Sequence, residues 1–389
     1  MANSNKNAMA GCLDGVRILE LARYQAGPRC GMVLSDLGAE VIKIEKPGGE
    51  DTRKSRPMVK GQSIYFMVYN RGKKSICLDL RQAAGKAVFF ELLKTADMVL
   101  ENFRPGTLEK MGLGYDELTK VKPDIILIRV SGFGQYGPYR ERGAFDPLGQ
   151  AMSGLMMLTG AQAHGEPIGT AFSLVDRISS LHAAIGALGA LCHRKETGEG
   201  QVIDVCLMDS AMTMVEIPAS YYLATGKEGG EQGRQPYVAK DGWIVCAPGS
   251  SATLRKRIYE MMGKEDMGDK QPAGGSLFFR MPALAEWCKE HTVDEIYEKL
   301  VAIGVPAAPI RSIPQAVKDP HVWERENLVK VPDAYAGELY VPGLSIKFSK
   351  TPGRLGPVPT PGQHTEEILS RLLNYNTTRI EQLRAQKII

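Results

Sequence analysis

The sequence predicts an α/β protein built around a parallel β-sheet, because strand and helix patterns alternate along its N-terminal part. Residues 16–21 alternate side-chain polarity like a strand, and residues 40–45 do the same. Between them, residues 30–38 have a helical apolar period and end at a glycine. The same order recurs further along, with strands at 74–80, 97–102 and 124–134 and a helix at 85–96. Since parallel strands need a crossover connection, usually a helix, this order predicts a doubly wound sheet.

Polar, glycine and proline residues gather where the predicted strands end. These segments are 22–28, 45–49, 101–106 and 131–137. Ligands of doubly wound sheets bind beyond the carboxyl ends of the strands, so we expect the ligand face there. The chain has neither G-x-G-x-x-G after the first strand nor G-x-x-x-x-G-K-[ST], which disfavours dinucleotide-binding enzymes and P-loop nucleotidases. The six histidines show no zinc spacing, so we predict no metal site.

A long helix follows an irregular segment that begins at Pro167. Ser173 and Asp176 have the spacing of a capping box, with Asp in place of Glu, and Gly198 can close the helix. The apolar residues that give the helical period are Ile178, Leu181, Ile185, Leu188 and Leu191. A helix N-terminus favours an anion, so we expect Asp176 to be ionised and able to act as a carboxylate nucleophile. The alternative is that Asp176 only completes the cap.

The remaining chain divides by composition. We predict a large domain over residues 1–225, a smaller α/β domain over 226–325, and a segment over 326–389 that returns to the large domain. Residues 226–234 are glycine-rich and charged, which indicates a linker or a lid. An amphipathic helix is expected around Glu366–Leu373.

Composition excludes several function classes. The 389 residues are 43% hydrophobic, enough for a large core, and 48 Lys+Arg against 44 Asp+Glu argue against a nucleic-acid-binding protein. Seven cysteines are scattered without a CxxC pair, as is typical of reduced thiols. The first ten residues are polar, and we see no apolar stretch long enough to span a bilayer. We therefore expect a cytoplasmic protein.

Several segments together resemble a known family. They are D-G-V-R-I-L-E-L-A, A-G-P, L-G-A-E-V-I-K-I-E-K-P, K-K-S-I-C-L-D-L, A-D-M-V-L-E-N-F-R-P-G, S-G-F-G-Q-Y-G-P-Y and R-K-E-T-G-E-G-Q-V-I-D-V. In this order, over nearly the whole chain, they are similar to the class III (CaiB/BaiF-type) coenzyme A transferases. The resemblance implies a Rossmann-like large domain, a small domain and an interlocked homodimer. It also implies acyl-CoA and carboxylic acid substrates, no tightly bound cofactor, and transfer through an acyl-aspartyl anhydride and an aspartyl-CoA thioester.

The same resemblance assigns roles to individual residues. Asp176 is the nucleophile, and Gln25 lies near the reacting carbonyl as a donor to the oxyanion. The CoA contacts fall on Tyr24, Lys46, Leu78, Asn102, Lys110 and Met111. Lys46 and Lys110 would meet phosphates, although either lysine can equally be a solvated surface group, and Gln25 can be a plain turn residue. Ser180 stands where the family often has glycine.

Two other functions compete with CoA transfer. An acyl-CoA racemase of the same superfamily uses a histidine in the segment that reads Gly143-Ala144-Phe145-Asp146 here, and a phenyl ring cannot move a proton. A non-catalytic CoA-binding protein would not need Asp176. The apolar residues Met152, Leu155, Met156 and Met157 suggest either a pocket for a larger acyl group or simply core.

Overall fold

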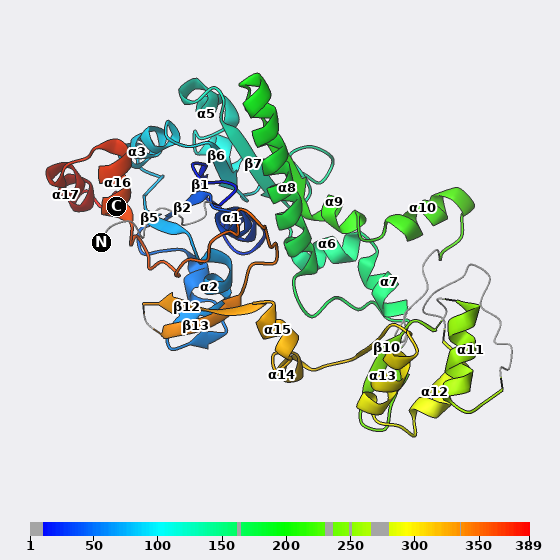
Figure 1. Ribbon diagram of the computed structural model, residues 1–389. Coiled ribbons are helices and arrows are strands. Elements are labelled where there is room, and N and C mark those ends of the chain that lie inside the picture. Colours follow the sequence, from blue (N-terminus) through cyan, green and yellow to red (C-terminus); the bar gives the residue numbers. More distant parts are fainter. Residues whose placement is uncertain (1–10, 162–164, 230–235, 249–250, 266–279, 335) are drawn as a thin grey trace. The chain divides into compact units, whose positions relative to one another are not determined.

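The computed structural model describes residues 11–389 except 162–164, 230–235, 249–250, 266–279 and 335. The chain forms two compact units (Figure 1). Unit 1 comprises residues 1–159, 167–215 and 323–389, and unit 2 comprises residues 160–166 and 216–322. The expected boundary after residue 225 lies at the far end of helix α10 (Glu216–Thr225), which belongs to unit 2. Most of the predicted 226–234 lid lies outside the described residues.

Six parallel strands form the central sheet of unit 1, which confirms the predicted parallel sheet. Their order is β5-β2-β1-β6-β7-β8. The strands are β1 (Arg17–Glu20), β2 (Glu40–Glu45), β5 (Lys74–Cys77), β6 (Met98–Glu101), β7 (Ile126–Ser131) and β8 (Val202–Cys206). Strand β2, which follows β1 in the central sheet, pairs with one edge of β1, and the later strand β6 pairs with the other edge of β1. This change of direction puts the topological switch point between β1 and β6.

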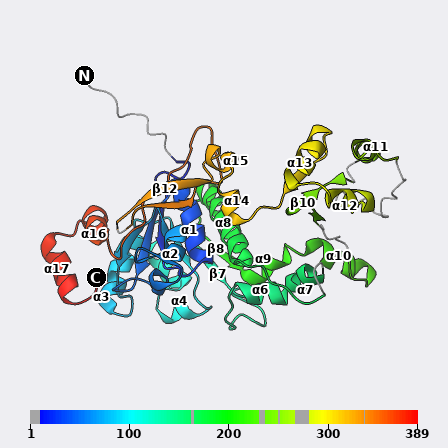
Figure 2. The ribbon, with the colours of Figure 1, turned by 90° about the horizontal axis from the view of Figure 1, so that it is seen from below.

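Helices cover both faces of this sheet, because successive strand residues point to opposite sides. Ile18 belongs to the core under α1 and α8, whereas its neighbour Leu19 belongs to the core under α3, α5, α16 and α17. Figure 2 shows α16 and α17 beside α3, with α1 and α8 on the other side of the strands. The bounds are α1 (Ala26–Asp36), α3 (Ala83–Leu93), α5 (Tyr115–Val121), α8 (Leu174–Thr197), α16 (Thr365–Leu373) and α17 (Thr377–Ala385).

The long helix α8 lies where the sequence predicts it and ends at Gly198 in the left-handed conformation. Its packing against α1, β7 and β8 uses small residues. The small residues that are fully or nearly buried are Ser179, Ser180, Ala183, Ala184, Ala187 and Ala190. By length and composition α8 could cross a membrane, so the expectation that no such stretch exists was wrong. In unit 1 one side of α8 packs against α1, β7 and β8, whereas Leu181 and Ile185 on it are exposed.

The C-terminal segment completes unit 1. β12 (Leu328–Asp333) and β13 (Gly337–Pro342) form an antiparallel hairpin, and α16 overlaps the predicted amphipathic helix. The last helix, α17, was not predicted, and it adds Ile380 and Leu383 to the core beneath α3. The remaining elements of unit 1 are short: a 3₁₀ turn (Asp51–Lys54), β3 (Met58–Val59), β4 (Gln62–Ser63), α2 (Ile64–Asn70), α4 (Thr107–Lys110), α6 (Asp146–Met152), α7 (Leu155–Ala161, whose end enters unit 2) and α9 (Leu207–Met212).

Unit 2 has its own small sheet and core. The antiparallel order is β11-β10-β9, and the core includes Ile244, Tyr259, Leu284 and Leu300. Its elements are α10, β9 (Tyr237–Val238), β10 (Trp243–Cys246), α11 (Ala252–Met261), α12 (Pro282–Cys288), α13 (Val293–Ala302), β11 (Ala307–Pro309), α14 (Ile313–Ala316) and α15 (Pro320–Glu324), which leads back to unit 1.

Candidate active site

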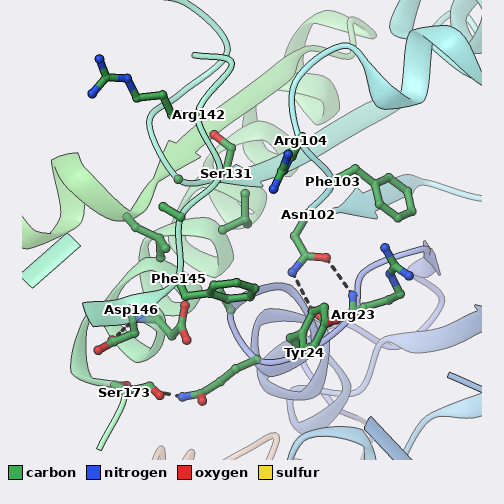
Figure 3. Close-up of a pocket in the computed structure, with 18 of the residues that line it drawn as sticks. Arg23, Tyr24, Asn102, Phe103, Arg104, Ser131, Arg142, Phe145, Asp146 and Ser173 are labelled. Atoms are coloured by element: carbon green, nitrogen blue, oxygen red, sulfur yellow. Dashed lines mark hydrogen bonds between the residues drawn. The ribbon is translucent and has the colours of Figure 1, made fainter. Parts of the chain in front are cut away.

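A cleft of about 660 Å³ opens in unit 1 at the carboxyl ends of β1, β6 and β7, where the switch point predicts a ligand. Figure 3 shows the side chains that these strand ends and the segment before α6 send toward it. Its lining residues are Arg23–Ala26, Tyr65, Asn102–Pro105, Thr107, Val130–Gly132, Arg142–Pro147, Ser173, Asp176 and Leu207. Four of the sequence-predicted site residues therefore meet in one cleft: Tyr24, Gln25, Asn102 and Asp176.

Asp176 lies on the first turn of α8, and its surroundings differ from the predicted capping box. The Ser173 side chain makes no capping hydrogen bond. The Asp176 N–H instead donates to Asp146 Oδ1 of α6 at 3.0 Å. The Ser173 carbonyl accepts from Gln25 Nε2 and Arg177 Nη1. The first turn of α8 is thus capped by a residue distant in sequence, and the capping-box prediction was wrong.

The protonation of Asp176 also departs from expectation. Burial first and the nearby Asp146 carboxylate second raise the pKa of its carboxyl, against the opposing effect of Arg177, and together they bring it to about 7. The expected preference for the anion at a helix N-terminus is outweighed, because the helix dipole acts weakly beside desolvation and a like charge. Asp176 therefore titrates near neutral pH.

Gln25 and Tyr24 follow β1 directly. Gln25 is the N-cap residue of α1 and is 3% exposed, and its Nε2 donates to the Ser173 carbonyl at a long 3.4 Å. Tyr24 has a φ of 64°, an uncommon conformation for a non-glycine residue, and its ring meets Phe145 edge to face at 5.8 Å. The loop after β1 therefore brings the buried side-chain amide of Gln25 and the exposed ring of Tyr24 to the cleft.

Asn102 ties together the two strands at the switch point. Its Oδ1 accepts from the Arg23 N–H at 2.7 Å, and its Nδ2 donates to the Arg23 carbonyl at 2.6 Å (Figure 3). Its amide is therefore engaged with the backbone that follows β1. Asn102 shapes the cleft, and its own polar atoms hold the loop that carries Tyr24 and Gln25.

The other predicted CoA contacts do not line this cleft. Lys46 follows β2 and forms an exposed ion pair with Asp51 at 2.5 Å. Leu78 is 2% exposed within the core, and Lys110 and Met111 close the short helix α4. Contacts of these four residues with CoA stay predictions.

Ser180, which departs from the family pattern, fits its place in α8. It is fully buried, its hydroxyl donates to the Arg177 carbonyl at 2.6 Å, and it accepts from Arg29 Nη1 at 2.9 Å. The hydroxyl group is thus satisfied, and it links α8 to α1.

Sequence reasoning missed Asp146 and the arginines of the cleft. Asp146 was noted only as the neighbour of Phe145, although Asp followed by Pro147 is a signal for a helix start. Arg23, Arg104 and Arg142 line the cleft and supply positive charge. Arg23 lies over the Phe103 ring, and no carboxylate pairs with these arginines among the ion pairs of the described residues.

Two other kinds of site lack support in the described part of the chain. There, no group of three or more His, Cys, Asp or Glu residues could hold a metal ion. The cleft is lined by Phe145, not by histidine. The arrangement can therefore supply a carboxylate nucleophile and amide donors, and it lacks the histidine of a racemase.

Known proteins match this chain over nearly its whole length. The family model described as CoA-transferase family III matches residues 13–365. Succinyl-CoA–D-citramalate CoA-transferase of Chloroflexus aurantiacus is 36% identical, covering 97% of this chain and 98% of the relative. Succinyl-CoA:mesaconate CoA-transferase of Haloarcula hispanica is 34% identical (95% and 99%), and human succinyl-CoA:glutarate CoA-transferase is 32% identical (97% and 90%).

A solved structure has the same fold. The crystal structure of a CaiB/BaiF family protein from Brucella suis superimposes with a TM-score of 0.79 at 32% identity, covering 93% of this chain and 100% of that one. Sequence family and fold therefore agree. The chain belongs to CoA-transferase family III, and it is an enzyme that transfers coenzyme A from an acyl-CoA to a carboxylic acid.

Proposed function

We propose that Asp176 is the covalent nucleophile of this transferase, that succinyl-CoA is the donor and that a small dicarboxylic acid is the acceptor. The observation that carries the proposal is the place of Asp176. It lies partly buried on the first turn of α8, in the cleft at the switch point, and Gln25 lines the same cleft. A carboxylate that titrates near neutral pH is more basic than an ordinary aspartate and so a better nucleophile toward a thioester.

The reaction needs no proton transfer. An oxygen of Asp176 attacks the thioester carbonyl carbon, a C–O bond forms, the C–S bond breaks, and CoA leaves as thiolate. The thiolate then attacks the Asp176 side-chain carbonyl of the anhydride, which gives aspartyl-CoA and free succinate. The acceptor carboxylate repeats both steps in reverse order. Gln25 supports this role, because its long bond to the Ser173 carbonyl leaves its amide available for the developing oxyanion.

The relatives and the charge of the cleft support the substrate class. The relatives are named for succinyl-CoA together with citramalate, malate, glutarate or mesaconate. Arg23, Arg104 and Arg142 offer positive charge for a second carboxylate or for CoA phosphates. The predicted Met152–Met157 acyl pocket finds no support, because none of those residues lines the cleft.

The assembly we propose is a homodimer with interlocked chains, in a reducing, cytoplasmic compartment. The seven cysteines are unpaired, as suits that compartment. In unit 2, α10 has no buried residue, and Leu223 is 84% exposed. In unit 1, α8 exposes Leu181 and Ile185. Apolar side chains left uncovered on two helices support a second copy as their partner.

A donor and acceptor panel tests the function. Purified enzyme is given succinyl-CoA with malate, citramalate, glutarate, mesaconate or acetate, and new CoA thioesters are measured by chromatography. We expect transfer to at least one dicarboxylate and little to acetate. Asp176→Ala should lower the rate at least about a thousandfold. Wild-type turnover by that variant would overturn the assignment of Asp176 as the nucleophile. Binding of CoA by the wild-type protein without any transfer would favour a non-catalytic CoA-binding protein.

A further inference from the structure

Asp146 holds the backbone of the nucleophile. It begins α6, thirty residues before Asp176, and it is 3% exposed. Its Oδ1 accepts the Asp176 N–H at 3.0 Å. The first N–H groups of a helix have no partner within the helix, so this bond satisfies one of them from a neighbouring element. The position of Asp176 thus depends on α6.

Gln150, one turn further along α6, secures this arrangement. It is 2% exposed, and its Nε2 donates both to Asp146 Oδ2 and to Thr170 Oγ1. Its Oε1 accepts the Thr170 N–H at 2.9 Å. One side-chain amide therefore connects Asp146 to the segment that leads into α8. Both N–H groups and the oxygen of Gln150 are used.

The two carboxyl groups also interact as charges. After burial, the Asp146 carboxylate is the main cause that raises the pKa of Asp176. Arg177, on α8 itself, opposes it, and the guanidinium of Arg177 lies over the Phe172 ring. From α2, Tyr65 lines the cleft as a phenol whose pKa is raised by burial and then by Asp176.

Two further side chains, Tyr69 and Arg29, form hydrogen bonds with Arg177 and not with Asp176. Tyr69 of α2 accepts a hydrogen bond from Arg177 Nη2, and Arg29 of α1 donates to the Arg177 carbonyl. Neither is a cause of the raised pKa of Asp176. Asp146 is thus the one like charge that acts on the nucleophile among these groups.

The repulsion between the Asp146 and Asp176 carboxylates changes during the proposed reaction. Attack on the thioester carbonyl forms a C–O bond, breaks the C–S bond and moves the negative charge from Asp176 to the leaving thiolate. Asp176 is uncharged in both the anhydride and the aspartyl-CoA thioester. Repulsion from Asp146 therefore acts on the free carboxylate and is relieved in each covalent intermediate.

We propose that Asp146 is a positioning residue that fixes the first turn of α8 through the Asp176 amide and, as a buried like charge, favours conversion of the free carboxylate into its covalent intermediates. The second part rests on the proposed nucleophile. The first part, and the charge interaction itself, do not depend on the substrate.

The test compares Asp146→Asn with Gln150→Ala. The asparagine keeps an oxygen for the Asp176 N–H, loses the oxygen that accepts from Gln150, and removes the charge. The alanine also removes the contact between Gln150 and Asp146, but it keeps the charge and loosens the segment around Thr170. In Asp146→Asn, the acidic limb of the kcat/KM profile should move down by on the order of one pH unit. In Gln150→Ala, kcat should fall about tenfold while the midpoint of that limb stays in place.

A second readout needs no substrate. Relative to Asp176→Asn, wild-type Tm should fall as the pH rises from about 4 to about 7, because the unfolded state releases the proton of Asp176 in this range while the folded state keeps it up to about pH 7. This fall should be smaller in Asp146→Asn and unchanged in Gln150→Ala. If Asp146→Asn shows the same fall in Tm as the wild type and the same acidic limb of kcat/KM, Asp146 has only a structural role. If Asp146→Asn does not fold, Asp146→Ser, which also keeps an acceptor, takes its place. A smaller fall without any transferase activity would support the charge interaction and overturn the proposed function alone.

Discussion

At the scale of single residues, Asp176 combines two properties that are usually opposed. It lies at a helix N-terminus, which stabilises an anion, and yet burial and Asp146 raise the pKa of its carboxyl to about 7. A group with a raised folded-state pKa contributes stability at low pH and loses it as the pH rises through that value. The proposed nucleophile therefore lowers stability at neutral and alkaline pH.

Removing the charge should reveal this cost. Asp176→Asn should raise the free energy of unfolding at pH 8, by up to about 4 kcal/mol at about 1.4 kcal/mol for each pH unit between the unfolded and folded pKa. The gain should nearly vanish near pH 4, where the folded-state aspartate is protonated and the unfolded-state aspartate is only about half ionised. Urea unfolding at both pH values measures it. A gain of equal size at pH 4 and pH 8 would contradict the raised pKa.

At the scale of elements, α8 has two parts with different roles. Its first turn carries Asp176 of the candidate site, and the turns that follow leave apolar side chains exposed. Its buried side packs on α1 and the sheet through alanines, while Ile185 is 65% exposed. Together with the exposed Leu181, this apolar side chain in the middle of a 24-residue helix supports the proposed contact with a second copy.

We therefore expect the protein to be a dimer that does not dissociate on dilution. Interlocked chains can separate only when a unit unfolds, so sizing chromatography at nanomolar concentration should give one dimer peak. Ile185→Glu should lower Tm, because it places a charge in that contact, while Lys195→Glu near the end of the same helix serves as the surface control. Folded monomer in ready exchange with dimer would contradict the interlocked arrangement.

At the scale of the whole molecule, the sequence predicts what depends on local pattern. The parallel sheet and the bounds of α8 follow from apolar periodicity and from Gly198. The place of Asp176 on that helix left its role open between nucleophile and cap, and only the family resemblance favoured the nucleophile. The cap of α8 could not be predicted in this way, because it comes from Asp146 on another helix. Helix α17 was not predicted, because its two buried residues, Ile380 and Leu383, are too few to give a clear apolar period.

The central claim is that Asp176 becomes covalently activated, and trapping with hydroxylamine tests it most directly. Enzyme is incubated with succinyl-CoA and no acceptor, because the first half of the reaction needs none. Hydroxylamine converts an anhydride or a thioester of a carboxyl group into a hydroxamate, which mass spectrometry locates. Asp146 and Asp176 lie in one tryptic peptide, since no Lys or Arg stands between Arg142 and Arg177, so fragment ions must separate them.

The account predicts a hydroxamate at Asp176 that depends on succinyl-CoA, and none at Asp146. Asp176→Ala should carry no label, whereas Gln150→Ala should still be labelled at Asp176. A hydroxamate at Asp146 or at another carboxyl group, with Asp176 unmodified, would contradict the central claim.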